Sequence, residues 1–284
     1  MWKKANKFIR SQAVLSAFLL SIIFISAITV LGVLILDMAS PGRLMVFTIG
    51  QLILAGIAVW LMCKLEVFDI NDFRFKGVGK GFRLAGFGFV YIAISFFINF
   101  MQIPENGFIA PNILSLFIVI LHPFIGTGLF EEVLYRGLVF KILLRKTGHS
   151  KRGVIFACVI SSVIFGVLHL VNVFAGASVL STISQVVHAT ATGLFFAAVF
   201  LRTKKLWIPI LLHGLLNLSA QIFNAIVSPD LLLKIPEPQT GTDAIGRTIY
   251  TLFIALPILI AALVLLRKVE PDGIPNDPPN FSNQ

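Results

Sequence analysis

The stretch Glu131-Glu132-Val133-Leu134-Tyr135-Arg136 places three ionisable side chains within six residues of an otherwise apolar segment. Before it, residues 113–130 contain no Asp, Glu, Lys or Arg. A charged side chain in the middle of a membrane helix costs about 2.5–3.5 kcal/mol on insertion scales, so three unpaired charges would cost roughly 8–10 kcal/mol. These charges must therefore be partnered or face a wet cavity, which makes the stretch the first candidate for a functional site.

Composition places the whole chain in a membrane. Hydrophobic residues make up 57% and charged residues 13% of the 284 positions, and the mean hydropathy is +0.93. A soluble globular domain has about twice that share of charged residues. The net charge of +10 is carried by short Lys and Arg clusters between apolar runs, so we expect no nucleic-acid partner. Cys63 and Cys158 lie inside apolar runs, and we expect them to pack rather than to form a disulfide.

Eight apolar segments are long enough to cross a bilayer as helices. We expect these spans at residues 13–36, 44–63, 84–101, 112–144, 154–171, 183–201, 206–226 and 248–266. Pro123, Gly126 and Gly128 are expected to kink the long fourth span just before the glutamates. The sequence thus predicts an all-α fold, a polytopic membrane helical bundle of about eight transmembrane helices. We expect a single domain over residues 1–268 and a disordered cytoplasmic tail over 269–284.

The distribution of basic residues predicts the orientation. With both termini cytoplasmic, the inner segments hold every Lys and Arg except Arg43, Lys234, Arg247 and the intramembrane Arg136. Such a positive-inside pattern indicates an integral membrane protein with cytoplasmic termini and the lipid bilayer as one partner. We expect the membrane to be a prokaryotic plasma membrane. Depths measured along straight helices predict that the candidate site lies in the cytoplasmic half of the bilayer, in a cavity open to the cytoplasm.

The two adjacent glutamates are expected to differ in role. Glu132 and Arg136 are four residues apart, the spacing at which an acid and a base pair on one helix face. Glu131 lies about 100° round the helix and is therefore less committed to that pair. The alternative is that all three charges form a structural polar knot between neighbouring helices.

Two further motifs place histidines inside membrane spans. Phe165 and His169 share one face of the fifth span, and Gly166 permits close approach of another helix. His213 and Asn217 share one face of the seventh span. A lone intramembrane histidine is more often a hydrogen-bonded packing residue, but two of them beside a pair of glutamates favour a functional site.

Together these groups can hydrolyse an amide bond. A carboxylate such as Glu131 in a low-dielectric site can act as the general base for water, and His169 can share and orient that water. His213 and the Asn217 amide can donate hydrogen bonds to the oxyanion of a tetrahedral intermediate. Glu131, His169 and His213 also resemble a two-histidine, one-glutamate zinc site, so the sequence leaves open whether a metal such as Zn is bound.

Three short motifs, taken in this order on successive membrane spans, resemble those of the CPBP family. They are Glu131-Glu132-x-x-x-Arg136, Phe165-x-x-x-His169 and His213-x-x-x-Asn217. The name covers type II CAAX prenyl endopeptidases and bacteriocin-processing enzymes, also called Abi proteins. The resemblance extends over about residues 112–217, which is under half of the chain.

This resemblance implies an intramembrane endopeptidase with an eight-helix core that acts on a peptide or protein substrate at the membrane. By that similarity, Glu131 would activate water together with His169. His213 and Asn217 would form the oxyanion hole. The supporting residues would be Glu132, Arg136 and Phe165. The family has been described both as metalloproteases and as metal-free glutamic proteases.

Two other classes of function are compatible with a polytopic fold. A non-catalytic immunity or scaffold protein would keep the fold and bind a partner, but it has no need of a spare carboxylate opposite two histidines. A transporter is expected to show internal repeats, and the sequence has none with matching motifs. Outside the motifs, we expect His122 and His188 to be structural and His149 to be solvated.

Overall fold

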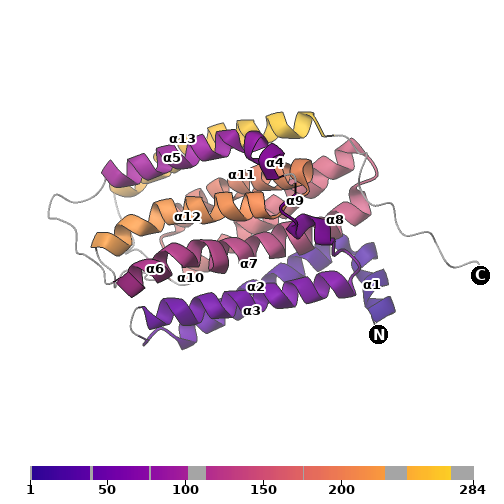
Figure 1. Ribbon diagram of the computed structural model, residues 1–284, viewed down its shortest axis with the longest axis horizontal. Coiled ribbons are helices and arrows are strands. Elements are labelled where there is room, and N and C mark those ends of the chain that lie inside the picture. The colour runs from indigo at the N-terminus through magenta and orange to yellow at the C-terminus, as the bar shows by residue number, and fades with distance from the viewer. Residues whose placement is uncertain are drawn as a thin grey trace, which may run out of the picture.

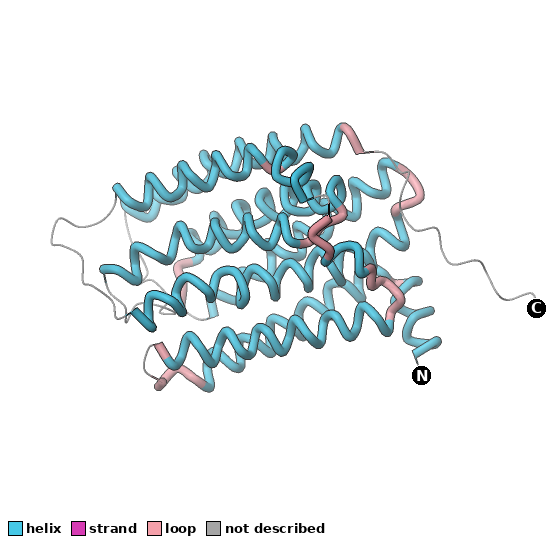
Figure 2. Tube along the Cα trace, viewed as in Figure 1, coloured by secondary structure: helices cyan, strands magenta, loops and turns pink. Residues whose placement is uncertain are grey.

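The apolar runs of the sequence form long helices that lie side by side in the computed structural model (Figure 1). It describes residues 2–38, 41–76, 78–101, 113–174, 176–227 and 242–269. Within these ranges every regular element is a helix (Figure 2). The predicted all-α class is confirmed.

In chain order, the elements are α1 (Trp2–Ser11), α2 (Ala13–Leu34), α3 (Gly42–Lys64), the 3₁₀ turn η1 (Ile70–Phe73), α4 (Val78–Leu84), α5 (Gly86–Met101), α6 (Ile113–Leu121), the π-helix η2 (His122–Gly128), α7 (Leu129–Glu132), the π-helix η3 (Val133–Val139), α8 (Phe140–Thr147), α9 (Lys151–Val167), the 3₁₀ turn η4 (Leu168–Leu170), α10 (Val171–Phe174), α11 (Val179–Thr203), α12 (Trp207–Val227) and α13 (Thr242–Arg267).

Six helices in the described part of the chain are long and apolar enough to cross a membrane, and two shorter apolar helices bring the number to the eight that the sequence predicts. The six are Ala13–Leu34, Gly42–Lys64, Ile113–Thr147, Lys151–Phe174, Val179–Thr203 and Thr248–Arg267, and the shorter ones are Gly86–Met101 and Trp207–Ile222. The chain is an integral membrane protein with a polytopic helical fold. The expected start of the fourth span at residue 112 and the tail from residue 270 lie outside the described residues.

Helix α11 forms the centre of the packing. Every residue from Ala191 to Leu201 is buried, as expected for a helix covered on all sides. It packs against α13 and α9 along most of its length and also contacts α12 and α4. The fourth span lies between α3 and α12, because both of these helices contact its central segments.

The expected kink of the fourth span is a π-helix. Pro123 cannot donate a backbone hydrogen bond, and the segment His122–Gly128 takes the wider π-helical winding without ending the helix. A single α-helical turn, α7, follows and carries both glutamates, and a second π-helix follows that turn. Single π-helical turns inside α-helices are found frequently at functional sites.

The connector between α3 and α4 is anchored by a buried acid. Asp72 is almost fully buried and forms an ion pair with Lys141. The Asp72 carbonyl oxygen accepts a hydrogen bond from the backbone N–H of Leu206 (2.9 Å), directly before α12. Burial raises the pKa of Asp72, and the neighbouring Lys141 ammonium acts in the opposite direction. The connector is thereby fixed against the start of α12.

Close backbone contact brings α12 against the fourth span. An ideal Cβ at Gly128 would lie 2.6 Å from the carbonyl oxygen of Pro123 and 3.1 Å from that of Ile210 on α12. Neither neighbour is a flexible side chain that could move aside. A side chain at this position would therefore separate α12 from the helix that carries the glutamates.

We predict that Gly128→Ala lowers the thermal stability of the detergent-solubilised protein. Overpacking of this kind costs about 1–3 kcal/mol. Gly56→Ala is the matched control, because an ideal Cβ at Gly56 meets nothing within 4 Å and alanine has the better helix propensity. Thermal unfolding of both variants, followed by fluorescence-detected size exclusion, measures the difference. Equal melting temperatures for the two variants would contradict the proposed close contact.

Candidate active site

Glu132 is the fully buried carboxylate of the pair. Its Oε1 accepts hydrogen bonds from Arg136 Nη1 and from His213 Nδ1, each at 2.8 Å. The side chain is 0% exposed, and Oε2 has no hydrogen-bond partner among the described residues. The structure thus contains the acid–base pair that the four-residue spacing predicts, and adds a histidine from α12 to it.

The Arg136 guanidinium joins this pair to a third helix. Its Nη2 donates to the carbonyl oxygen of Gly193 on α11 at 2.8 Å. Its Cζ lies 5.0 Å from the ring centroid of Phe165 and 5.5 Å from that of Phe196, both within the range of a cation–π contact. The charge of Arg136 is therefore compensated by a carboxylate, a carbonyl group and two aromatic faces.

Glu131 is the more accessible carboxylate. Its side chain is 16% exposed and lines a cavity, in contrast to Glu132. Its Oε2 lies 3.6 Å from His213 Nε2, which is longer than a hydrogen bond. Glu131 is thus close to one histidine and uncommitted to Arg136, as its place on the helix predicts.

His213 lies between the two glutamates. A carboxylate only accepts hydrogen bonds, so the Nδ1 that faces Glu132 carries the hydrogen. In the neutral ring, Nε2 then presents a lone pair toward Glu131. The rings of Phe165 and Phe196 pack against the imidazole at centroid distances of 5.9 and 5.4 Å and fix its orientation.

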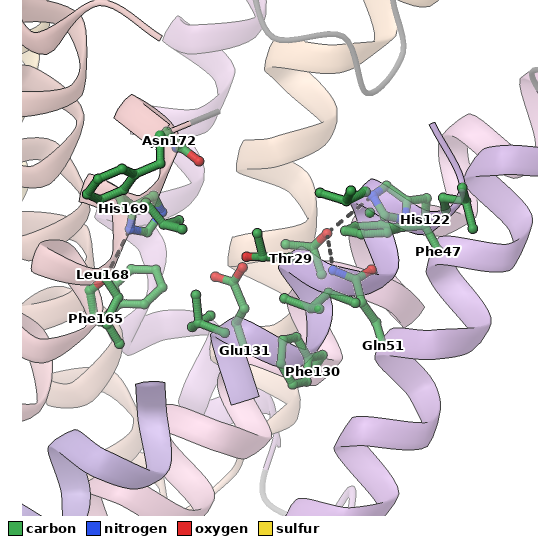
Figure 3. A pocket seen from close by; sticks show the side chains of 18 of the residues that line it. Thr29, Phe47, Gln51, His122, Phe130, Glu131, Phe165, Leu168, His169 and Asn172 are labelled. Atoms are coloured by element: carbon green, nitrogen blue, oxygen red, sulfur yellow. Dashed lines mark hydrogen bonds between the residues drawn. The ribbon is translucent and has the colours of Figure 1, made fainter. Parts of the chain in front are cut away.

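His169 lies across the cavity from α3, in the short turn η4 that follows α9 (Figure 3). Its Nδ1 is 3.0 Å from the carbonyl oxygen of Phe165. Because a carbonyl oxygen can only accept, Nδ1 is the donor, and Nε2 of the neutral ring remains as an acceptor. The residues Glu131 and His169 line the same cavity.

The cavity has a volume of about 620 Å³. Helix α2 lines it from Ile25 to Val33, followed by Ile35 and Leu36 just after the helix, and α3 lines it from Arg43 to Gln51. These are the halves of the two helices farthest from α1 (Figure 1). The cavity extends to Phe174, at the end of α10. Figure 1 shows α1 and the last turns of α13 at the opposite end of the bundle. The lining therefore lies mainly in the half of the bundle farther from α1 (Figure 1), whereas the depths along straight helices placed the site nearer the end that carries the termini.

Asn217 lies one turn after His213 on α12 and is half-buried. It is not among the residues that line the cavity, whereas Gln221, one turn further on, is. The three residues share one face of the helix, because they are spaced by four. Sequence reasoning missed Gln221, although the same spacing could have indicated it. It also missed Tyr135, which lines the cavity four residues after Glu131.

A chain of hydrogen bonds with a fixed direction forms another wall of the cavity. Thr48 Oγ1 donates to the carbonyl oxygen of Leu44 and accepts from His122 Nδ1, both at 2.8 Å. His122 Nε2 must then accept, so Thr127 Oγ1 donates to it at 3.3 Å. Thr127 Oγ1 in turn accepts from Gln51 Nε2 at 3.2 Å. His122 is thus a buried, hydrogen-bonded residue, as expected, and it also lines the cavity.

The two remaining histidines lie outside the cavity lining. His188 Nε2 is hydrogen-bonded to the Tyr91 hydroxyl at 2.6 Å, which agrees with the structural role expected of it. His149 is exposed in the turn between α8 and α9, as expected for a solvated residue.

The possible metal ligands do not come together as a metal site. Among the described residues, no group of three His, Cys, Asp or Glu side chains is close enough to hold a metal ion. Glu131 and His213 are close to each other, but both nitrogens of His213 already face glutamates. Glu131, His169 and His213 are therefore not arranged as a three-ligand zinc site in this structure.

The fold and the site define a polytopic membrane protein with a buried acid–base centre. Residues 113–219 match the family model described as type II CAAX prenyl endopeptidase Rce1-like. This segment contains all three motifs, so this part of the chain is similar to that family. The chain is also similar to the "Putative membrane peptidase YdiL" of Bacillus subtilis (strain 168), with 34% identity over 87 residues. That alignment covers 31% of this chain and only 29% of the relative's length.

We predict that Arg136→Ala lowers the folded yield. The substitution leaves the Glu132 carboxylate buried without its cationic partner, a change that costs about 3–5 kcal/mol. The amount of monodisperse protein after solubilisation and its melting temperature measure the effect. Arg152→Ala is the control, because Arg152 is exposed at the start of α9. A stable and monodisperse Arg136→Ala protein would show that the pair does not support the fold.

We predict that the cavity is accessible from the membrane side opposite the termini. In a background with Cys63→Ser and Cys158→Ala, a cysteine at Thr29, which lines the cavity, should react with a membrane-impermeant thiol reagent from that side. Lys146→Cys is the control for the other side, since Lys146 is exposed near the end of α8. Protease accessibility of a C-terminal tag reports the sidedness of the vesicles. If Thr29→Cys is instead labelled from the membrane side that carries the C-terminal tag, the cavity opens on the side of the termini and the predicted access route is wrong.

Proposed function

We propose that the protein is an intramembrane endopeptidase that hydrolyses a peptide bond of a membrane-associated peptide or protein. The observation that carries the proposal is the difference between adjacent carboxylates. Glu132 is fully buried in a structural pair, whereas Glu131 lines a cavity large enough for a peptide segment. The match to a type II CAAX prenyl endopeptidase family and the similarity to a membrane peptidase support the same class of reaction.

In the proposed mechanism, Glu131 is the general base. It removes a proton from a water molecule while the water oxygen attacks the carbonyl carbon of the scissile bond. Nε2 of His169 accepts the second hydrogen of that water and so orients its lone pair. When the tetrahedral intermediate collapses, the C–N bond breaks and Glu131 returns the proton to the leaving amine. No covalent intermediate with the protein is formed.

The oxyanion of the intermediate needs hydrogen-bond donors. The Asn217 amide is one candidate, because it lies on the His213 face of α12 and has no hydrogen-bond partner among the described residues. His213 is the other, but its Nδ1 hydrogen is committed to Glu132. Nε2 can therefore donate to an oxyanion only when the ring carries a second proton. In that form, carboxylates stand on both sides of the imidazolium.

We also propose that both termini are cytoplasmic and that the substrate enters from the opposite face of the membrane. The clustering of Lys and Arg at the end of the bundle that carries α1 supports the orientation. The position of the cavity in the other half of the bundle supports the entry route.

The decisive test compares Glu131→Gln with Glu132→Gln. Glutamine keeps the size of Glu131 but cannot accept the proton, so hydrolysis should fall at least ~10²-fold while the folded yield stays unchanged. Glu132→Gln is the matched control: it weakens the contact with Arg136 and lowers the yield, but the protein that folds should retain turnover. Purified protein in liposomes, incubated with a library of membrane-associated peptides and assayed by mass spectrometry of the products, measures both rates.

If the Glu131→Gln variant cleaves peptides at the wild-type rate, Glu131 is not the general base. If wild-type protein cleaves no peptide and the biological effect of the chain survives Glu131→Gln, the protein is instead a non-catalytic scaffold of the same fold. If Glu131, Glu132 and Arg136 only hold neighbouring helices together, both glutamine substitutions should lower the folded yield equally.

A further inference from the structure

A second hollow lies on the membrane-facing side of the fourth span, away from the glutamates. It is a groove of about 370 Å³ between η2, α7, the start of α12 and the segment around α4. Its lining is apolar and is formed by Phe75, Phe82, Phe124, Ile125, Leu129, Trp207, Ile208, Ile210 and Leu211. Phe75 and Phe82 are 69% and 41% exposed, so the groove is open to the surroundings of the bundle.

Trp207 is held rigidly in the wall of this groove. Its indole Nε1 donates to the carbonyl oxygen of Phe73 at 2.5 Å, and its ring stacks on Phe75 with a centroid distance of 4.9 Å and an interplanar angle of 10°. Gly81 brings α4 close to α12, because an ideal Cβ there would lie 2.8 Å from Ile208 Cγ1. The groove is therefore preformed rather than created by an occupant.

The rim of the groove is basic. Phe75 lies between Arg74 and Lys76 in the sequence, and all three are exposed. Lys80 and Arg83 are exposed on α4, on either side of Phe82, and no Asp or Glu occurs between Asp72 and Glu105. The rim thus combines several cations with aromatic side chains, and tryptophan beside basic residues is typical of the headgroup level of a membrane.

A further cation reaches the rim from α12's side. Lys205 Nζ donates to the carbonyl oxygen of Asn71 at 2.6 Å, and Arg74 Nη1 donates to the Asn71 side-chain oxygen at 3.4 Å. The nearest buried acid, Asp72, is already paired with Lys141. Two cations therefore converge on Asn71, whose backbone N–H and side-chain amide donate to the exposed Asp69 carboxylate at 2.9 Å, so one acid stands beside these cations.

We propose that this groove is a binding site for an anionic phospholipid, with an acyl chain in the apolar groove and the phosphate on the basic rim. The apolar lining matches a hydrocarbon chain, and the charge of the rim matches a headgroup that is negative as a whole. A zwitterionic phospholipid fits the groove equally well but gains less from the rim. Lipid binding at this groove does not require proteolytic activity. A failed test of lipid binding would therefore leave the proposed function unaffected, and the reverse is also true.

Trp207 provides a direct probe of occupancy. The chain has three tryptophans, and Trp2 and Trp60 contact each other at a ring distance of 5.3 Å, away from the groove. Trp2→Phe with Trp60→Phe leaves Trp207 as the single fluorophore. The full-length protein is reconstituted in phosphatidylcholine vesicles that contain increasing fractions of brominated phosphatidylglycerol or brominated phosphatidylcholine, and bromine quenching of Trp207 is measured.

We expect half-maximal quenching at a mole fraction at least about five-fold lower for phosphatidylglycerol, since each basic side chain near a membrane surface favours an anionic lipid by roughly that factor. Lys76→Gln with Lys80→Gln removes two of the basic side chains of the rim and should reduce the preference for phosphatidylglycerol at least about five-fold. Lys146→Gln with Arg152→Gln removes two exposed basic residues elsewhere and should leave the preference unchanged.

Equal quenching by the two lipids in the protein with its basic rim intact would overturn the proposal and leave only ordinary contact with the bilayer. A preference that Lys76→Gln with Lys80→Gln leaves unchanged would overturn the assignment of the headgroup to this rim. As a second measurement, the preference of the unsubstituted rim should decrease as the salt concentration rises, and a salt-independent preference would also contradict it.

Discussion

The hydrogen bonds that converge on Glu132 Oε1 are the constraint on which the site depends. Arg136 and His213 both donate to this one oxygen, and Arg136 also donates to the carbonyl of Gly193. Three membrane helices are thereby fixed at the same level: the fourth span, α11 and α12. A buried charge that loses its partner is strongly destabilising, so the register of these helices cannot shift without leaving Glu132 or Arg136 unpaired.

This constraint also explains how two adjacent carboxylates come to have different surroundings. Consecutive residues of a helix point about 100° apart, so the inward contact of Glu132 leaves Glu131 directed to the cavity. The glutamates occupy one α-helical turn between two π-helices. The π-helical winding before and after this turn changes the direction in which the flanking side chains point. The turn that carries the two carboxylates keeps α-helical geometry.

Local patterns in the sequence predicted a large part of this arrangement. Apolar length predicted the helices, and the four-residue spacing predicted the contact between Glu132 and Arg136, because both depend on neighbours along one helix. The side on which the cavity lies was not predictable in the same way. Depth along straight helices ignores which helices diverge, and the cavity depends on packing among α2, α3 and η4. The chain of hydrogen bonds from Gln51 to His122 joins residues more than 70 positions apart, so no local spacing indicates it.

The cavity and the lipid-facing groove share a thin wall. On α7, Leu129 lines the groove and the adjacent Phe130 lines the cavity; on η2, Ile125 lines the groove and Thr127 the cavity. The two hollows therefore lie on opposite faces of the helix that ends in the glutamates. Phe130 is 1% exposed, so the wall between the two hollows is closely packed next to the glutamates. A lipid bound as proposed would therefore lie against the groove side of this wall, close to the turn that carries Glu131 and without touching its carboxylate.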